Sequence, residues 1–181
     1  MSRCRMIALV ASLATFTGAD GLAAQDRTME IGIDSGIQRQ SYEGSSQTLL
    51  AMPTGWPTFR APFRIGEFVS KRLELEPAFG FLATSSYAFF VGSWSMLYHY
   101  PDDPAATRPY VRVGALLRAI SDGSSSTQFA LEGALGVKVP ARAGIGTRLE
   151  FGLGHAFENR SKRLEGLELL DITLGLSYFL Q

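Results

Sequence analysis

The sequence predicts an all-β fold, an eight-stranded antiparallel up-and-down transmembrane β-barrel. The first observation behind this prediction is the terminal segment 169–181, in which large apolar residues alternate with small or polar ones. Successive side chains of a strand point to opposite faces, so the alternation separates two faces. One face is unbroken for about ten residues, the length of a tilted strand that crosses a bilayer. It consists of Leu170, Ile172, Leu174, Leu176, Tyr178 and Leu180.

The second observation is an export signal in residues 1–24. Arg3 and Arg5 precede an uncharged apolar run at 6–17, and small residues at 21–24 supply a cleavage site. Cleavage would remove Cys4, the one cysteine of the chain, and with it any disulfide or thiol chemistry. We therefore expect a cleaved signal peptide at 1–24, an outer-membrane barrel domain at 25–181, and a location outside the cytoplasm.

The third observation is that no later segment approaches the roughly 18 consecutive apolar residues of a membrane-spanning helix. A closed barrel is the other structure that satisfies its own backbone inside a membrane. With the terminal strand, seven further alternating segments give the even number of strands typical of bacterial barrels. These segments are 28–38, 63–69, 73–84, 87–100, 110–120, 128–138 and 147–157.

The connections between these strands fall into two groups, one at each end of the barrel. Turns at 70–72, 101–109 and 140–143 are assigned to the periplasmic end, where both termini lie. Loops at 39–58, 84–87, 121–127 and 158–166 are assigned to the outer end, and the longest of them is rich in turn-forming residues. Pro77 interrupts the strand at 73–84 and lacks a ladder donor, so we expect a β-bulge there.

Aromatic residues are predicted to form two girdles at the membrane interfaces, as bilayers select. Tyr98, Tyr100, Tyr110 and Tyr178 are assigned to the periplasmic rim, with His99 as an interface anchor beside them. Phe81, Phe89, Phe129 and Phe157 are assigned to the outer rim. In the aromatic-rich strand 87–100, we expect Phe90, Trp94, Met96 and Tyr98 to face outward.

The opposite faces of the strands combine glycine with charges of both signs. An eight-stranded barrel has an interior that side chains just fill, and arginine suits bidentate pairing with carboxylates in a confined space. We therefore predict a lumen filled by neutralising pairs. The alternative is a soluble lipocalin-like carrier, in which the same charged face would meet water. The predicted lumen charge network is Glu30, Asp34, Arg64, Glu74, Glu76, Arg112, Arg118, Glu132, Lys138, Arg148, Glu150 and Asp171.

The export signal, eight amphipathic strands, mixed-charge lumen and terminal Leu-Gly-Leu-Ser-Tyr-Phe-Leu-Gln together resemble small outer-membrane barrels of the OmpA/OmpX type. Such barrels usually end in an aromatic residue, whereas here Phe179 is followed by Leu180 and Gln181. The resemblance implies location in the cell outer membrane and contact with its lipid and lipopolysaccharide. It also implies recognition of the C-terminal strand by the barrel-assembly machinery.

Little in the sequence predicts catalysis. The histidines are His99 and His155, and neither forms the His-x-Ser pair of the lipid A deacylases that some small barrels resemble. We expect no enzyme activity, no metal and no cofactor, and the zero net charge does not favour nucleic acid as a partner. The predicted role of this monomer is structural or interactive, with Tyr42 and Trp56 of loop 39–58 as contacts for an extracellular ligand. A narrow pore, a lipid-modifying enzyme and a soluble carrier remain alternatives.

Overall fold

The computed structural model describes residues 29–52, 58–100, 107–122, 124–141, 144–159 and 164–180. The predicted signal peptide and Trp56 lie outside these residues. Within them, nine strands form one antiparallel sheet. The strands are β1 (Met29–Tyr42), β2 (Ser45–Ala51), β3 (Phe63–Phe68), β4 (Leu73–Ala83), β5 (Ala88–His99), β6 (Arg108–Ser121), β7 (Ser125–Pro140), β8 (Ile145–Ala156) and β9 (Leu167–Leu180).

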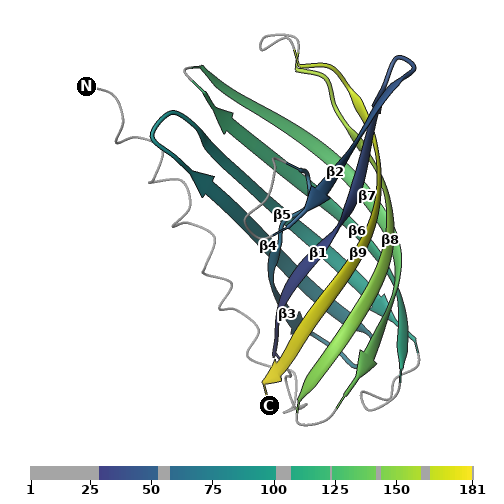
Figure 1. The fold of residues 1–181 in the computed structure, drawn as a ribbon. Coiled ribbons are helices and arrows are strands. Elements are labelled where there is room, and N and C mark those ends of the chain that lie inside the picture. The colour runs from purple at the N-terminus through teal and green to yellow at the C-terminus, as the bar shows by residue number, and fades with distance from the viewer. Residues whose placement is uncertain are drawn as a thin grey trace.

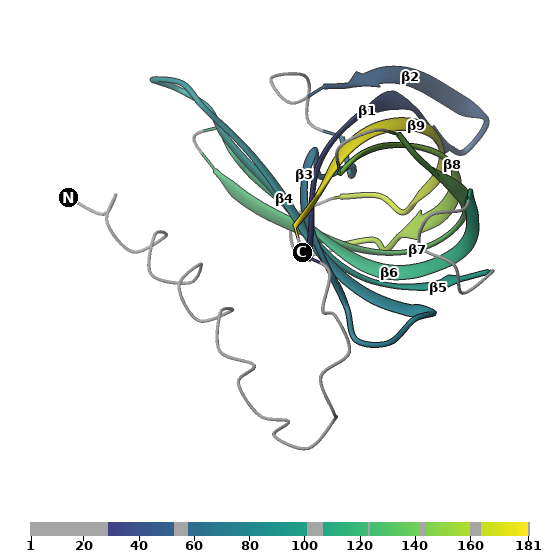
Figure 2. The same ribbon diagram turned by 90° about the horizontal axis from the view of Figure 1, so that it is seen from below.

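Eight of the described strands, β1 and β3 to β9, close into a barrel (Figures 1 and 2). Each pairs with the next in chain order, and β1 closes the circle by pairing with β9 from Met29↔Leu180 to Ser41↔Glu168. This confirms the predicted eight-stranded up-and-down barrel. We call the end where Met29 meets Leu180 the inner end, and the end that carries the β1–β2 turn the outer end (Figure 1).

The β1–β2 hairpin replaces most of the predicted loop 39–58. β1 continues to Tyr42, turns at Glu43 and Gly44, and returns as β2 along its own outer part. Both turn residues have positive φ, 40° and 82°, which matches the two-residue turns preferred in hairpins. The loop prediction was wrong because beyond the membrane a strand needs no apolar face, so its polar sequence gives no alternation to detect.

β1 divides one of its edges between two partners. Its inner part pairs with β3 from Met29 to Ile33, and its outer part pairs with β2. In the described sheet, β2 has no pairing with β4, whose outer residues Gly80–Ala83 pair with β5 alone. Figure 2 shows β4 and β5 diverging from β1 and β2 on this side of the barrel. The hydrogen-bonded wall is therefore interrupted in its outer half.

Residues 58–62, which we call the lumen segment, run inside the barrel between β2 and β3. The backbone N–H of Asp34 donates to the carbonyl of Pro62 at 2.8 Å, and the N–H of Phe59 donates to Gln38 Oε1 at 2.9 Å. Phe59 is fully buried against Leu116 and Leu169. The segment thus fills space in the outer half of the lumen. Residue 58 was predicted to belong to the outer loop 39–58, and no element was predicted at 59–62.

Side chains are distributed inside out relative to a soluble protein. The outer surface carries large apolar residues such as Phe81, Leu153 and Leu174, which are 68%, 59% and 65% exposed. Charged residues such as Arg64 and Glu150 are buried in the lumen. A soluble carrier would bury the apolar face instead, so the distribution contradicts that alternative. No described residue belongs to a helix long and apolar enough to span a membrane.

The predicted outward or inward direction of the aromatic side chains is wrong where the alternation of side chains along a strand was not applied. Phe90, Trp94, Met96 and Tyr98 have their side chains directed outward, as predicted, on alternating positions of β5. Neighbouring positions must then point inward, and Phe89 and His99 are buried in the lumen. Tyr110 is buried for the same reason, because it shares the inward face of β6 with Arg112. Neither His99 nor Tyr110 anchors an interface.

Pro77 does not cause the predicted bulge. The pairs Arg64↔Ala78 and Glu67↔Leu75 on either side of it keep the same register. The ladder between β3 and β4 simply lacks pairs at this point, as expected where the ring removes a backbone donor. β4 keeps an unbroken pairing with β5 through Pro77↔Trp94 on its other edge, so no extra residue is needed.

Candidate functional site

Arg64 forms the centre of a buried ion network in the inner half of the lumen. It extends inward from β3 and contacts carboxylates on two other strands. Its guanidinium bonds to Glu30, to Asp34 Oδ1 at 3.0 Å and to Glu76 Oε2 at 3.4 Å. It also donates to Ser177 Oγ at 2.6 Å. Arginine satisfies this many acceptors because its five N–H donors are held in a rigid fork.

Lys138 and His99 continue the network toward the inner end. Lys138 Nζ lies 2.5 Å from Glu30 Oε2 and 2.7 Å from Glu74 Oε2. His99 Nε2 lies 2.7 Å from the same Glu74 oxygen, and the imidazole is fully buried. Glu30, Glu74 and Glu76 are close enough to one another to hold a metal ion. Ammonium and guanidinium groups already neutralise all three carboxylates, so the geometry gives no reason to place a metal there.

The network extends outward through Arg148 and Arg112. Arg148 joins Glu76 Oε2 at 2.6 Å to Asp34 Oδ2 at 3.2 Å. Arg112 bonds to Glu132 and approaches Glu150 Oε1 at 2.9 Å. Buried charges are tolerated only where they are paired and hydrogen-bonded. Arg148 and Glu76 join β8 to β4 on the opposite side of the barrel, whereas Arg112 and Glu132 lie on the adjacent strands β6 and β7.

Inward-facing glycines create the room for these long side chains. A Cβ on Gly32 would clash with the guanidinium of Arg64, and one on Gly152 would clash with the Asp171 carboxylate. A Cβ on Gly175 would meet Asp34 and come within 2.8 Å of Arg148 Cγ. Glycine and charged residues therefore occur together on the lumen faces of the strands because each of these glycines leaves space for a charged side chain from a neighbouring strand.

Arg60 of the lumen segment belongs to the network, and the sequence analysis missed it. Its Nη1 lies 2.7 Å from Glu150 Oε1 and 3.8 Å from Asp171 Oδ2, and its Nη2 lies 3.3 Å from Asp34 Oδ2. The charges of the predicted network indicated that a further cation was needed, because seven of its members are acidic and five are basic. An excess of buried carboxylates requires further cations.

Arg118 is also buried in the lumen, where its contacts differ from those of the other basic residues. Its Nη2 donates to Gln128 Oε1 at 2.6 Å, and its guanidinium lies 4.0 Å from the centroid of the Phe59 ring. Among the described residues, no carboxylate lies within ion-pair distance of it. The other eleven predicted members all contact an opposite charge: Glu30, Asp34, Arg64, Glu74, Glu76, Arg112, Glu132, Lys138, Arg148, Glu150 and Asp171.

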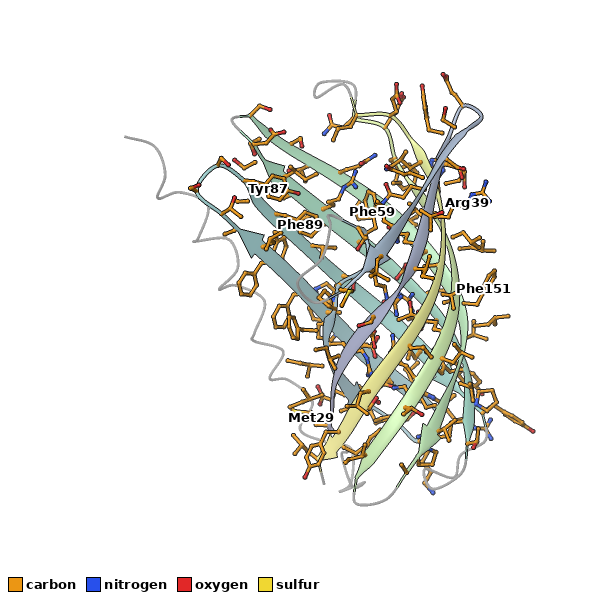
Figure 3. All side chains as sticks on the ribbon, viewed as in Figure 1. Met29, Arg39, Phe59, Tyr87, Phe89 and Phe151 are labelled. Atoms are coloured by element: carbon orange, nitrogen blue, oxygen red, sulfur yellow. The ribbon has the colours of Figure 1, made fainter. Side chains whose placement is uncertain are left out.

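At the outer end, an open cleft of about 420 Å³ lies beside the β1–β2 turn. Tyr42, the predicted contact residue, lines it together with Arg39, which Figure 3 shows toward the outer end. Partial desolvation, followed by hydrogen bonds to and the charges of Glu43 and Glu165, raises the pKa of the Tyr42 phenol to about 12. The phenol therefore stays protonated beside these carboxylates. The lining comprises Arg39, Ser41, Tyr42, Glu43, Gly44, Ser45, Ser46, Gly166 and Glu168.

His155 points away from the lumen near the same cleft. Its Nδ1 lies 2.8 Å from Glu168 Oε1, with the two side chains 48% and 72% exposed. Its ring meets Phe157 edge-on with centroids 5.1 Å apart. In the described part of the chain, each histidine has one ring nitrogen bonded to a carboxylate, His99 Nε2 to Glu74 and His155 Nδ1 to Glu168. Neither arrangement presents a nucleophile to a base.

The fold is shared with solved outer-membrane barrels. Neisserial surface protein A matches with a TM-score of 0.60 at 13% identity, over 83% of this chain and 96% of that one. Ail, the attachment invasion locus protein of Yersinia pestis, matches with a TM-score of 0.52 at 10% identity, over 86% of this chain and 100% of that one. No protein-family model matches the sequence, and the curated proteins include no similar sequence.

Proposed function

We propose that this chain is an integral outer-membrane β-barrel protein that recognises a surface ligand at its outer end. The observation that carries the membrane assignment is the inside-out distribution of side chains. Ile172, Leu174 and Leu176 of β9 are 51%, 65% and 53% exposed, while Arg64 and Glu150 are almost completely buried. An apolar belt around a polar interior is the arrangement that a bilayer requires of a barrel. The shared fold with known outer-membrane barrels is consistent with it.

The filled lumen favours a structural and interactive role over transport. Ion pairs join Arg64, Lys138 and Arg148 to carboxylates across the inner half, and the lumen segment with Arg60 fills part of the outer half. Interiors of eight-stranded barrels are just wide enough for side chains to fill. The proposal therefore includes no pore and no enzyme activity. The C-terminal strand β9 is the segment through which the barrel-assembly machinery would recognise the chain.

The outer cleft carries the proposed binding role. Its walls offer hydroxyl groups from Ser41, Ser45 and Ser46, a phenol from Tyr42, and both charged donors and carboxylate acceptors. Such a lining matches a ligand with many hydroxyl groups. The carboxylates of Glu43 and Glu168 outnumber the one guanidinium, that of Arg39, in this lining. Like-charge repulsion then disfavours an anionic ligand, so we propose a neutral oligosaccharide at the cell surface.

The membrane assignment is tested by extraction and gel mobility. We expect the mature protein to remain with the membrane after a carbonate wash, to need detergent for release, and to migrate differently in gels with and without boiling. Boiling unfolds a barrel that resists the gel detergent at room temperature. Recovery of the protein from a detergent-free soluble fraction would contradict the assignment.

The binding role is tested on an array of neutral and sulfated oligosaccharides. Wild-type protein should bind neutral members, and Tyr42→Ala and Glu168→Gln should each reduce that binding about tenfold, the equivalent of about 1.4 kcal/mol. Ser124→Ala, on the exposed turn before β7, serves as the control and should bind as the wild type does. Equal binding by all three variants and the wild type would contradict the role of the cleft.

A further inference from the structure

We infer that the outer half of the lumen binds an amphiphile, with its anionic head on Arg118 and its apolar tail along the inner face of β4, β5 and β6. The proposed site lies apart from the surface cleft and is lined by different residues. At its centre is the buried Arg118 guanidinium, which has no carboxylate within ion-pair distance among the described residues.

Arg118 is 9% exposed, and every other buried cation of the network has a carboxylate partner. The described carboxylates all lie beyond ion-pair distance of Arg118. In the sequence, residues 53–57, 123 and 160–163 include no Asp or Glu. Burial of an unpaired charge is costly, and an anion from outside the chain would offset that cost.

An apolar surface adjoins Arg118 on the inside of the barrel. Arg118 of β6 pairs with Val91 of β5. The next lumen-facing pair toward the outer end is Ile120 with Phe89. Phe89 and Val91 are buried in a cluster that also contains half-buried Leu82, Tyr87 and Ile120. Most of the lumen is polar, so this cluster is not explained by charge pairing. It offers an apolar tail a path that begins at the guanidinium.

This cluster contains a polar group that has no hydrogen-bond partner among the described residues. The Tyr87 hydroxyl is buried, and none of the described residues hydrogen-bonds to it. Figure 3 shows Tyr87 beside Phe89 toward the outer end, with Phe59 nearer the barrel centre. Burial, the leading effect, and the charge of Asp122 raise the pKa of Tyr87, whereas Arg118 lowers it. Tyr87 packs on the cluster that contains Val91, and Val91 is the residue paired with Arg118, so the proposal places both polar groups at the same end of the site.

The entry that we propose for such a ligand lies where the strand pairing of the wall is interrupted. β4 and β5 carry the apolar cluster, and β4 is the strand whose outer part pairs with neither β2 nor β1 in the described sheet. Ala61 of the lumen segment packs on the inner end of the cluster, while Leu82 and Tyr87 at its outer end remain partly exposed. An amphiphile could therefore enter from the outer leaflet or from the outer end.

The test uses the protein in nanodiscs of a zwitterionic phospholipid with a fluorescent fatty acid, 11-(dansylamino)undecanoic acid, and its neutral methyl ester. Wild-type protein should bind the acid saturably and should bind the ester at least about tenfold more weakly. A tenfold difference in affinity corresponds to about 1.4 kcal/mol, which is reasonable for one charge-assisted hydrogen bond. Arg118→Gln should reduce acid affinity about tenfold and leave ester affinity unchanged, and Arg118→Lys should retain most of the acid affinity.

Two further variants keep the test decisive if Arg118→Gln does not fold, as judged by its gel mobility without boiling. Tyr87→Phe should weaken the acid several-fold and the ester less. Leu82→Asn should weaken both. Arg72→Gln, on the exposed turn at the inner end, is the control and should bind both probes as the wild type does.

Competition identifies the source of the head group. Displacement of the probe by laurate alone assigns the site to free fatty acids, and displacement by added phosphatidylglycerol assigns it to anionic membrane lipid. Either result supports the inference. It is overturned if the acid does not bind saturably, if acid and ester bind equally well, or if folded Arg118→Gln binds the acid like the wild type. In those cases the Phe59 ring and Gln128 alone are the partners of Arg118.

Discussion

Arg60 Nη1 lies 2.7 Å from Glu150 Oε1, and both side chains are buried inside the barrel. The pair joins the lumen segment to β8, a strand that begins more than eighty residues later in the sequence. Glu150 also accepts from Arg112 at 2.9 Å and from the Tyr110 hydroxyl at 2.7 Å. The lumen segment is therefore held by the same network that fills the inner half.

Removal of the Arg60 side chain should destabilise the barrel. Arg60→Ala leaves Glu150, Asp34 and Asp171 with one fewer compensating charge, and loss of one partner of a buried ion pair costs about 3 kcal/mol. The measurement is the urea midpoint of protein refolded into lipid vesicles, followed by tryptophan fluorescence. Arg72→Ala at the exposed turn is the control and should change stability by less than about 0.5 kcal/mol. Equal midpoints for both variants would contradict the anchoring role of Arg60.

The wild-type barrel should not conduct ions. Arg64 and Lys138 are joined to carboxylates of β1 and β4 across the inner half, and Phe59 is fully buried in the outer half. We therefore expect planar bilayers with the reconstituted protein to show no stepwise current, whereas an open porin in the same bilayers should. Regular current steps from the wild type would mean that the network opens.

Inward glycines should be less tolerant of substitution than outward ones. Gly175→Ala places a methyl group against Asp34 and within 2.8 Å of Arg148 Cγ, so we expect it to cost about 1–3 kcal/mol as overpacking does. Gly133→Ala is the matched control, because the nearest atom to its Cβ is the Arg112 carbonyl oxygen at 3.8 Å. It should be neutral or slightly stabilising. Urea midpoints measure both, and a reversed order would contradict the packing role of the lumen glycines.

A charge on the apolar belt should destabilise the protein in membranes. Leu174 is 65% exposed near the middle of β9, opposite Ser35 of β1 and Leu149 of β8. Leu174→Arg should cost about 2–4 kcal/mol if this position lies near the bilayer midplane. Thr48→Arg on exposed β2, beyond the belt, should cost little. In a water-exposed barrel Leu174→Arg would be harmless, so an unchanged midpoint in vesicles would argue against membrane insertion.

The sequence by itself determined the barrel and the facing of most side chains. Alternation with period two fixes which residues share a face, because neighbouring side chains of a strand point in opposite directions. This is why Leu174 and Asp171 could be assigned to opposite faces and why the charged set was found. The misplaced Tyr110 and Phe89 follow from the same rule, since aromatic character was weighed ahead of parity.

Only the tertiary structure decided what the charges contact and what fills the outer half. Ion pairs such as Arg64 with Glu30 or Arg60 with Glu150 depend on closure of the barrel, which brings side chains from distant strands to one axis. Periodicity gives no information about an irregular stretch, so the lumen segment could not be detected. Arg118 is the opposite case. Its position on the lumen face of β6 is like that of Arg112, which pairs with Glu150, but in the described structure no carboxylate reaches Arg118.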